Sequence, residues 1–447
     1  MIKYSSFKKL SNYLFNFSHF LFSNLNYSIF RNNQNIIVNE INDIKENGRI
    51  GIFIPRRNLS KNICNSLKLM YNESGNLYKK LQYLGGNSMM NYDEDLLFFS
   101  FNFYNKSDKE TIDLIDEIIN SIYNEKIDNK ENNDILNKKL EITNFFNQIN
   151  NINDDNNSEF YDFLYQREKE NKNEKINIQT LNKSIKETIQ TSPKNIIVTS
   201  GLINSSSLSH KKIYEIIENK LLKFKPKEIK YCKNPLINKI YEKRIEEQNE
   251  SLLNLKFFFP TYPWNSNLII LYGILSEIIG SATPFSSGGP GKGIFSRAYT
   301  EILNNNDNII HFKTLNLPSQ FYGLFGFDFS FYKNENNIIN SLCNLIKNLN
   351  HINQEEFDRA KNILKRKIIN SLVNNSGRVE EIGKEIFYFD KIIGYNILEI
   401  IDKITLNDLN KEIKKMINKK NDSILFIKGY SKDINKIPKR EKILELI

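Results

Sequence analysis

The stretch Phe99-Ser100-Phe101-Asn102-Phe103-Tyr104 places a phenylalanine at every second position, and the same F-x-F-x-F-Y pattern returns at Phe327-Asp328-Phe329-Ser330-Phe331-Tyr332. Successive side chains of a β-strand point to opposite faces, so this alternation predicts a strand with one face buried in a core. The two stretches lie 228 residues apart (327 − 99). This spacing suggests two copies of one sheet-forming unit.

Two further matches occur at the same spacing. Residues 181–186 read LNKSIK and residues 409–414 read LNKEIK, and 409 − 181 is again 228. An apolar run that ends at Gly201 has its counterpart in a run that ends at Gly429, with the same difference. Three matches in order at one spacing predict a duplicated domain.

A fourth match shows where the two copies differ. Gly51-Ile52-Phe53-Ile54-Pro55 resembles Lys256-Phe257-Phe258-Phe259-Pro260, but here the spacing is 205 (260 − 55). The second copy therefore carries about 23 additional residues (228 − 205) between this strand and its F-x-F-x-F-Y strand. Loops added to a rigid scaffold are common places for function, and this insertion holds the glycine-dense segment of the chain.

Each copy reads as strands followed by consecutive helices, which predicts the α+β class. We expect two duplicated α/β-sandwich-like domains, each a mostly antiparallel sheet packed against helices. The helices after the aromatic strands are expected from Thr111 to Tyr123 and from Asn337 to Leu349. Asn353 and Glu356 form a capping-box pattern ahead of an apolar-periodic run, which predicts the start of another helix.

The first 35 residues differ in composition from the rest. They contain no acid, and apolar residues recur in them at helical spacing. A basic, acid-free amphipathic start is typical of a mitochondrial presequence. The basic residues are Lys3, Lys8, Lys9 and Arg31.

The expected organisation has four segments. Residues 1–35 form the presequence, and residues 36–225 form the N-terminal copy of the duplicated domain. Residues 226–250 are charged and rich in asparagine, which suits a linker. Residues 251–447 form the C-terminal domain, with a glycine-rich loop at 285–293.

The composition excludes several classes of protein. The 447-residue chain has 62 Lys and Arg against 52 Asp and Glu, a net charge of +10. The cations are spread along the chain without a nucleic-acid-binding motif, so a solvated basic surface is the simplest interpretation. Three widely spaced cysteines argue against a disulfide framework or a cysteine-based zinc site. No apolar run reaches the ~20 residues of a membrane-spanning helix.

The glycine-dense loop lies between two helical patterns, Asn267 to Ile279 and Ile294 to Leu303. Four glycines in the six residues 288–293 give the backbone freedom and expose amides that an extended peptide could bind. The phosphate-loop pattern G-x-x-x-x-G-K-[ST] fails twice, because Ser286 replaces the first glycine and Gly293 replaces the Ser or Thr. A mobile surface connector is the other interpretation that these residues allow. The candidate substrate-binding residues are Ser287, Gly288, Gly289, Pro290, Gly291, Lys292 and Gly293.

The run GGPGKGIFSRAY (288–299) resembles the glycine-rich loop of the alpha subunits of mitochondrial processing peptidases, a branch of the pitrilysin-like zinc protease family. The similarity extends to Phe258-Phe259-Pro260 and Pro263-Trp264-Asn265 before the loop. After the loop it includes Gly323-Leu324-Phe325-Gly326 and the E-E-x-x-R-A-K run at 355–361. The resemblance covers residues 45–447 and is strongest over 257–312. The family loop opens with a longer run of glycines, where this chain has Gly280-Ser281-Ala282-Thr283-Pro284.

Catalytic members of that family carry H-x-x-E-H on an early helix, where the histidines bind zinc and the inner glutamate activates water. The corresponding segment here, Ser60 to Leu67, has no histidine and no carboxylate. The chain's histidines are too far apart in sequence to form this motif or H-E-x-x-H: His19, His210, His311 and His351. We therefore expect no catalytic residue, no metal ligand and no cofactor in this chain.

The resemblance implies that a partner carries the chemistry. It implies a heterodimer with a zinc-bearing beta subunit in the mitochondrial matrix, in which this chain binds presequence peptides and no nucleic acid. The alternative with the same ancestry is a structural core subunit of ubiquinol–cytochrome c reductase. Association with a respiratory complex on the matrix side of the inner membrane therefore stays open.

Overall fold

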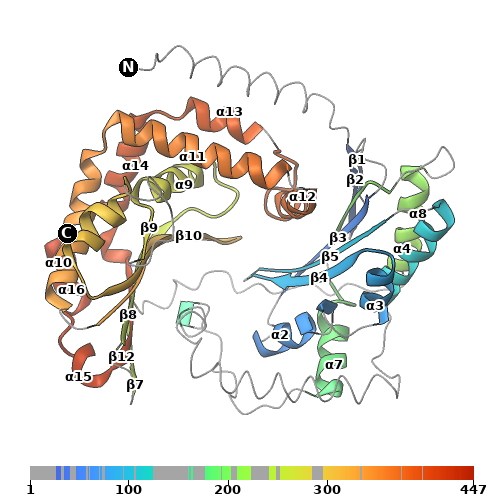
Figure 1. Ribbon diagram of the computed structural model, residues 1–447, viewed down its shortest axis with the longest axis horizontal. Coiled ribbons are helices and arrows are strands. Elements are labelled where there is room, and N and C mark those ends of the chain that lie inside the picture. Colours follow the sequence, from blue (N-terminus) through green and yellow to red (C-terminus); the bar gives the residue numbers. More distant parts are fainter. Residues whose placement is uncertain are drawn as a thin grey trace. The chain divides into compact units, whose positions relative to one another are not determined.

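The computed structural model divides into two compact units, each built on a six-stranded sheet (Figure 1). Unit 1 comprises residues 1–145, 175–230 and 372–395, and unit 2 comprises residues 146–174, 231–371 and 396–447. The structure describes residues 27–31, 35–40, 47–56, 59, 61–69, 71–72, 76–93, 95–104, 107–123, 160, 163–164, 177–192, 194–202, 209–222, 241–247, 252–283, 295–332, 335–373, 375–394 and 396–447.

The sheet of unit 1 has the strand order β1-β2-β6-β3-β5-β4. β2 and β6 are parallel neighbours, and the other neighbouring pairs are antiparallel. The strands are β1 (Tyr27–Arg31), β2 (Asn35–Glu40), β3 (Asn47–Pro55), β4 (Asn87–Tyr92), β5 (Leu96–Tyr104) and β6 (Asn195–Ser200).

One face of this sheet is covered by helices from unit 1 (Figure 1). The aromatic strand β5 contributes Phe99, Phe101 and Phe103 to the core between sheet and helices. Phe98 and Ser100, which alternate with them on the strand, are buried as well, so both faces of β5 are covered and the predicted single buried face is wrong. Fully burying one phenylalanine stabilises a fold by ~1.5–3 kcal/mol. The helices are α2 (Lys61–Leu69), α3 (Asn76–Tyr83), α4 (Asp108–Tyr123), α7 (Ile178–Thr188) and α8 (His210–Leu221).

The sheet of unit 2 has the strand order β7-β12-β8-β11-β10-β9. β7 and β12 are parallel neighbours, and the other neighbouring pairs are antiparallel. The strands are β7 (Glu242–Glu247), β8 (Leu252–Thr261), β9 (Ser281–Ala282), β10 (Ile309–Pro318), β11 (Gly323–Tyr332) and β12 (Ile424–Tyr430).

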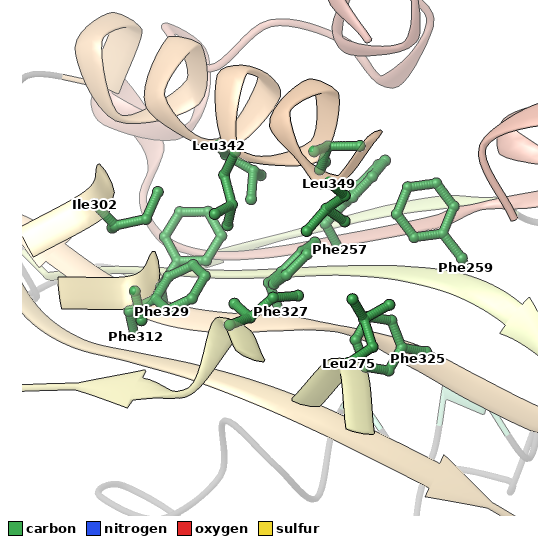
Figure 2. Packing of buried hydrophobic residues seen from close by; sticks show 14 of the residues in the cluster. Phe257, Phe259, Leu275, Ile302, Phe312, Phe325, Phe327, Phe329, Leu342 and Leu349 are labelled. Atoms are coloured by element: carbon green, nitrogen blue, oxygen red, sulfur yellow. The ribbon is translucent and has the colours of Figure 1, made fainter. Parts of the chain in front are cut away.

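Phenylalanines dominate the core of unit 2. Figure 2 shows Phe257 and Phe259 of β8 gathered with Phe325, Phe327 and Phe329 of β11 between the sheet and its helices. All five are at most 1% exposed. Asp328 and Ser330, which alternate with the phenylalanines of β11, are buried too, so this strand has two covered faces where the sequence predicted one. The helices are α9 (Ile269–Ile279), α10 (Glu335–Asn348), α11 (Gln354–Val373), α13 (Asn396–Lys403), α14 (Leu406–Asn418), α15 (Ser431–Ile434) and α16 (Arg440–Leu446).

The two sheets repeat one topology. In order across each sheet, β2, β6, β3, β5 and β4 correspond to β7, β12, β8, β11 and β10. The matching runs 181–186 and 409–414 both form helix, within α7 and α14. β9 is an addition at the edge of unit 2 and comes from the inserted segment. The predicted α+β class, with two duplicated and mostly antiparallel sheets packed against helices, is confirmed.

Unit 1 is completed by a helix from late in the sequence. Helix α12 (Asn375–Phe389) packs on the second face of the unit 1 sheet, where Val379, Ile382 and Ile386 form a core with Phe53 and other strand residues. Gly383 of α12 is needed for this close approach, because a Cβ atom there would overlap the Phe53 ring. The contact explains why residues 372–395 belong to unit 1.

Unit 2, in turn, includes a residue from early in the sequence. Phe160 is 1% exposed and lies on the second face of the unit 2 sheet. Its ring stacks on Phe258 at a centroid distance of 5.0 Å and meets Phe426 edge-on at 5.5 Å. Each unit therefore uses an element from the other half of the sequence to cover its second face.

The expected boundaries stay predictions, and two strands lie inside segments that were not expected to fold into a domain. β1 falls within 1–35 and pairs with β2, and β7 falls within 226–250 and pairs with β12. The helix expected from Thr111 begins at Asp108, and that expected from Asn337 begins at Glu335.

In the described part of the chain, no helix is long and apolar enough to cross a membrane.

Candidate peptide-binding loop

The candidate residues Ser287 to Gly293 lie outside the described residues, as does the whole segment 284–294. The structure does describe both flanks of this segment, which end at Thr283 and resume at Phe295. These flanks establish where the loop leaves unit 2 and where it returns.

The loop leaves unit 2 at the end of α9. The helix stops at Gly280, as the sequence predicted, and the φ of 74° at this glycine lies in the left-handed region that glycine favours. The next two residues form β9, which pairs antiparallel with β10. Thr314 Oγ1 donates a hydrogen bond to the Gly280 carbonyl oxygen at 2.8 Å. The departure point is therefore fixed to the sheet edge.

The loop returns to the same place. A Cβ atom built on Gly280 would lie 2.6 Å from Cβ of Ser296, closer than Cβ atoms approach in proteins. The two residues therefore pack against each other and form the neck of the loop, where the described flanks on either side of residues 284–294 meet.

Arg297 anchors the returning chain. Its side chain is 8% exposed and forms a bidentate ion pair with Glu356, with Nε–Oε1 at 2.9 Å and Nη2–Oε2 at 3.0 Å. Nη1 also donates to the Asn348 carbonyl oxygen at 2.6 Å, and Nη2 donates to the His351 carbonyl oxygen at 2.9 Å. A planar guanidinium that meets a carboxylate and two carbonyls has little freedom to move.

Glu356 belongs to the predicted capping box at the start of α11, which the structure confirms. The Glu356 N–H donates to Asn353 Oδ1 at 2.9 Å, and the Asn353 N–H donates to Glu356 Oε2 at 3.1 Å. Burial by itself would raise the pKa of Glu356, but hydrogen bonds from Arg297 and the Asn353 N–H, with nearby positive charge, hold it below its usual value. The carboxylate is therefore ionised at neutral pH.

A second residue of α11 holds the position before the anchor. Arg359 Nη2 donates to the Phe295 carbonyl oxygen at 2.9 Å, and the guanidinium carbon lies 5.5 Å from the centroid of the Phe295 ring. The same helix is fixed to the end of α13, because Lys361 Nζ donates to the carbonyl oxygens of Asp402 and Ile404. The E-E-x-x-R-A-K run at 355–361 is thus the support of the loop.

In the sequence, the run at 355–361 is recognisable only through the family resemblance. Arg297 and Glu356 are 59 residues apart in sequence, and Phe295 and Arg359 are 64 apart. Contacts over such distances leave no local pattern in the chain. The capping box was the one signal that pointed to Glu356.

The helix expected from Ile294 to Leu303 differs from the prediction. A π-helix covers Ala298–Ile302 and a 3₁₀ turn follows at Leu303–Asn305, while Ile294 lies outside the described residues. The Leu303 N–H donates to the carbonyl oxygens of both Ala298 and Tyr299. π-helical turns are rare and are frequent at functional sites, and this one begins directly after the loop anchor.

The helix at the position of the zinc motif has a structural role. α2 directs Cys64 and Leu67, both 0% exposed, into the unit 1 core. Asn65 Oδ1 accepts a hydrogen bond from the Tyr92 hydroxyl at 2.7 Å. Within the described ranges, no three His, Cys, Asp or Glu side chains come together as metal ligands would.

Residues 203–364 match the family model described as the peptidase M16 inactive domain. The match covers about a third of the chain. The match in the M16 inactive domain includes the loop, both of its flanks and the supporting residues Arg297, Glu356 and Arg359.

Three similar proteins bear names that agree with the predicted resemblance. The chain is 29% identical over 150 residues to the probable mitochondrial-processing peptidase subunit alpha of Schizosaccharomyces pombe, covering 32% of this chain and 29% of that protein. It is 27% identical over 151 residues to the alpha subunit of Neurospora crassa, covering 32% and 26%. The alpha subunit of Solanum tuberosum is 27% identical over 150 residues, covering 32% and 30%. The matched part of the chain thus spans less than a third of these relatives, and the predicted resemblance is confirmed.

One solved structure shares the fold of nearly the whole chain. A chain in the structure of Complex III2 from Candida albicans, with Inz-5 bound, is similar with a TM-score of 0.64. The similarity covers 94% of this chain and 99% of that chain at 13% sequence identity. At this identity the likeness concerns the fold alone.

Proposed function

We propose that this chain is the non-catalytic, substrate-recognition subunit of a mitochondrial processing peptidase. It binds presequences of imported precursors in the mitochondrial matrix and presents them to a zinc-bearing beta subunit, which cleaves them. The observation that carries this proposal is the glycine-rich loop that leaves and returns through one neck and is anchored there by the buried Arg297–Glu356 pair.

The loop suits a ligand that varies in sequence. Its ends are rigid because hydrogen bonds to β10, α10 and α11 hold them. Its centre contains Gly288, Gly289, Gly291 and Gly293, whose amides are not shielded by side chains. Main-chain hydrogen bonds can hold an extended peptide whatever its side chains are. A subunit that receives many different presequences needs this kind of contact.

The hydrolytic step is assigned to the partner. The chain has no H-x-x-E-H motif, and α2 presents Cys64 and Leu67 to its core where a zinc helix would present ligands. Peptide hydrolysis in this family depends on a metal-activated water. We therefore expect the zinc ion to be held by the beta subunit of a heterodimer.

A structural core subunit of ubiquinol–cytochrome c reductase is the rival function. The likeness to a chain of Complex III2 does not favour it, because both functions use one fold. An anchored glycine-rich loop at the sheet edge favours the recognition function, since a purely structural subunit does not require one. Co-migration of the chain with cytochromes in native gels would favour the rival.

Deletion of Gly288 to Gly293 tests the loop assignment. We expect the heterodimer to form as before in size-exclusion chromatography, while its affinity for a fluorescent presequence peptide falls at least tenfold. A matched variant keeps the loop length and replaces the four glycines of this segment with alanine, which restricts the backbone. An unchanged affinity in the deletion variant would overturn the assignment.

A further inference from the structure

We propose that β1 belongs to the mature protein and that the cut which removes the presequence falls before Tyr27. The expected presequence, residues 1–35, includes this strand and the first residue of β2. The inference rests on the mitochondrial location in the proposed function. It assigns the processing site of this chain to the residues that precede β1.

β1 forms one edge of the unit 1 sheet (Figure 1). Its residues Tyr27–Arg31 pair antiparallel with residues 36–40 of β2, whose other neighbour is β6. Without β1, β2 would become the edge strand and would present a row of unpaired N–H and C=O groups. Its residues Ile36, Ile37 and Val38 are at most 6% exposed, and an apolar edge strand is a template for pairing with other chains. A mature chain that lacks β1 is therefore expected to aggregate.

A cut after residue 35 would also remove a buried side chain. Asn35 is 2% exposed, and its Oδ1 accepts a hydrogen bond from Asn195 Nδ2 of β6 at 3.0 Å. Asn195 Oδ1 in turn accepts a hydrogen bond from the Tyr123 hydroxyl at 3.0 Å. Taking one partner away from a buried hydrogen-bonded group leaves its desolvation uncompensated. These contacts place Asn35 in the folded unit and not in a segment that is discarded.

Phe30 and Arg31 attach β1 to two helices of unit 1. The Phe30 ring stacks on Tyr214 of α8, with the ring centroids 4.6 Å apart. Arg31 Nη1 forms an ion pair with Asp390 Oδ2 at 3.0 Å, and Nη2 donates to the Asp390 carbonyl oxygen at 2.6 Å. Asp390 directly follows α12, the helix that packs on the second face of the unit 1 sheet. β1 therefore contacts elements on both faces of that sheet.

The backbone of Asp390 explains why its contact with Arg31 matters. Asp390 has a φ of 57°, in the left-handed region that few non-glycine residues adopt. Its N–H donates to the Ile386 carbonyl oxygen at 3.1 Å, so this residue ends α12. Lys194 Nζ lies 3.5 Å from Asp390 Oδ1, and Arg31 holds the other carboxylate oxygen and the carbonyl. Arg31, which the sequence counts among the presequence cations, thus has a place in the folded unit.

The residues before β1 keep the composition of a presequence. Residues 1–26 contain Lys3, Lys8 and Lys9 and no acidic residue. A basic, acid-free segment is typical of a mitochondrial presequence. The targeting pattern in the sequence therefore does not depend on β1.

The position of the cut is measured on the full-length precursor. The precursor is imported into isolated mitochondria, and the first residue of the mature chain is identified by mass spectrometry of its N-terminal peptide. We expect this residue to lie between positions 10 and 27, so that the three lysines are removed and β1 is kept.

A first residue after Tyr27 would overturn the inference, and so would an imported chain that keeps the three lysines. Both results would leave the proposed function standing, because that function is measured by peptide cleavage in the heterodimer. A precursor that does not enter mitochondria would contradict the location on which both depend.

Two pairs of variants test the reason for this position. A chain that starts at Ile36 should yield less soluble heterodimer than one that starts at Tyr27, and it should unfold at a lower urea concentration in circular dichroism. Arg31→Met should lower the folding equilibrium constant about fivefold, the upper end for an exposed ion pair. The matched change Lys211→Met, which breaks an exposed ion pair with Glu215 at 3.9 Å, should lower it by less than about twofold. Equal stability of the two truncated chains, or equal effects of the two substitutions, would overturn the role given to β1.

Discussion

Replacing Glu356 with glutamine tests the anchor of the loop, because it removes one charge and keeps the size of the side chain. Arg297 would remain as a cation whose side chain is only 8% exposed. Its other partners are two carbonyl oxygens, of Asn348 and His351, and the Glu301 carboxylate at 3.8 Å. Breaking a buried ion pair by removing one partner costs ~3–5 kcal/mol. Because hydrogen bonds to the carbonyls remain, we expect the lower limit, ~3 kcal/mol of unfolding free energy.

The helix cap remains intact in this variant. A glutamine completes a capping box as a glutamate does, so the Asn353 N–H keeps its acceptor. The loss of unfolding free energy in this variant therefore measures the contribution of the ion pair. Urea unfolding followed by the fluorescence of Trp264, the single tryptophan of the chain, measures the stability of unit 2. The double variant Arg297→Met/Glu356→Gln should recover most of the loss, because it leaves no unpaired charge and keeps the cap. A loss below ~1 kcal/mol for Glu356→Gln, the range of an exposed salt bridge, would refute the claim that this pair anchors the loop.

The pair also predicts how stability depends on pH. The folded pKa of Glu356 lies below its ordinary value of about 4.3. The stability contributed by the ionised carboxylate is therefore complete above the unfolded pKa and is lost as the pH falls through the folded pKa. We expect the difference in unfolding free energy between wild type and Glu356→Gln to be constant above about pH 5 and to shrink below about pH 4. A difference that grows as the pH falls would contradict this assignment of the shift.

Two more variants test the exchange of elements between the halves of the sequence. Gly383→Ala forces a Cβ atom into the Phe53 ring, and we expect a net loss of ~1–2 kcal/mol in urea unfolding followed by circular dichroism, because overpacking outweighs the gain in helix propensity. In the matched change Gly273→Ala, the new Cβ atom meets only the end of the Leu364 side chain at 3.4 Å. We therefore expect the unfolding free energy to rise by up to ~1 kcal/mol. A fall equal to that of Gly383→Ala would contradict the packing explanation. Phe160→Ala should destabilise unit 2 by ~3 kcal/mol or more, monitored by Trp264 fluorescence, although residue 160 lies in the first half of the sequence. An unchanged Trp264 transition would show that the Phe160 contact does not stabilise that unit.

The repeat in the sequence predicted much of the architecture. The F-x-F-x-F-Y stretches form β5 and β11, which lie at corresponding places in the two sheets. The runs that end at Gly201 and Gly429 form β6 and β12. These features are readable because strand alternation and a fixed spacing are local properties of the chain.

The exchange of elements between the two halves could not be predicted in the same way. The apolar face of α12 shows that the helix packs on a surface, but it does not specify which sheet provides that surface. A glycine lowers the stability of a helix, and the reason for Gly383 is apparent only from the Phe53 ring that packs against it. The contact joins positions that are far apart in sequence, so no pattern within either segment indicates it.

The candidate site was predicted in part. The sequence located the loop and the Gly280 at which α9 ends, and it recognised the capping box at Asn353 and Glu356. It did not indicate that Arg297 and Arg359 hold the returning chain, since both contacts depend on how α11 packs beside the loop. The assignment of Ser287 to Gly293 to peptide binding stays a prediction.

Cleavage of a presequence peptide tests the central claim most directly. The purified chain is assayed alone and mixed with a zinc-bearing beta subunit, with and without a chelator. We predict no cleavage by the chain alone, and chelator-sensitive cleavage by the mixture that exceeds the activity of the beta subunit by itself. Zinc-dependent cleavage by the chain alone, or a mixture no more active than the beta subunit, would contradict this prediction.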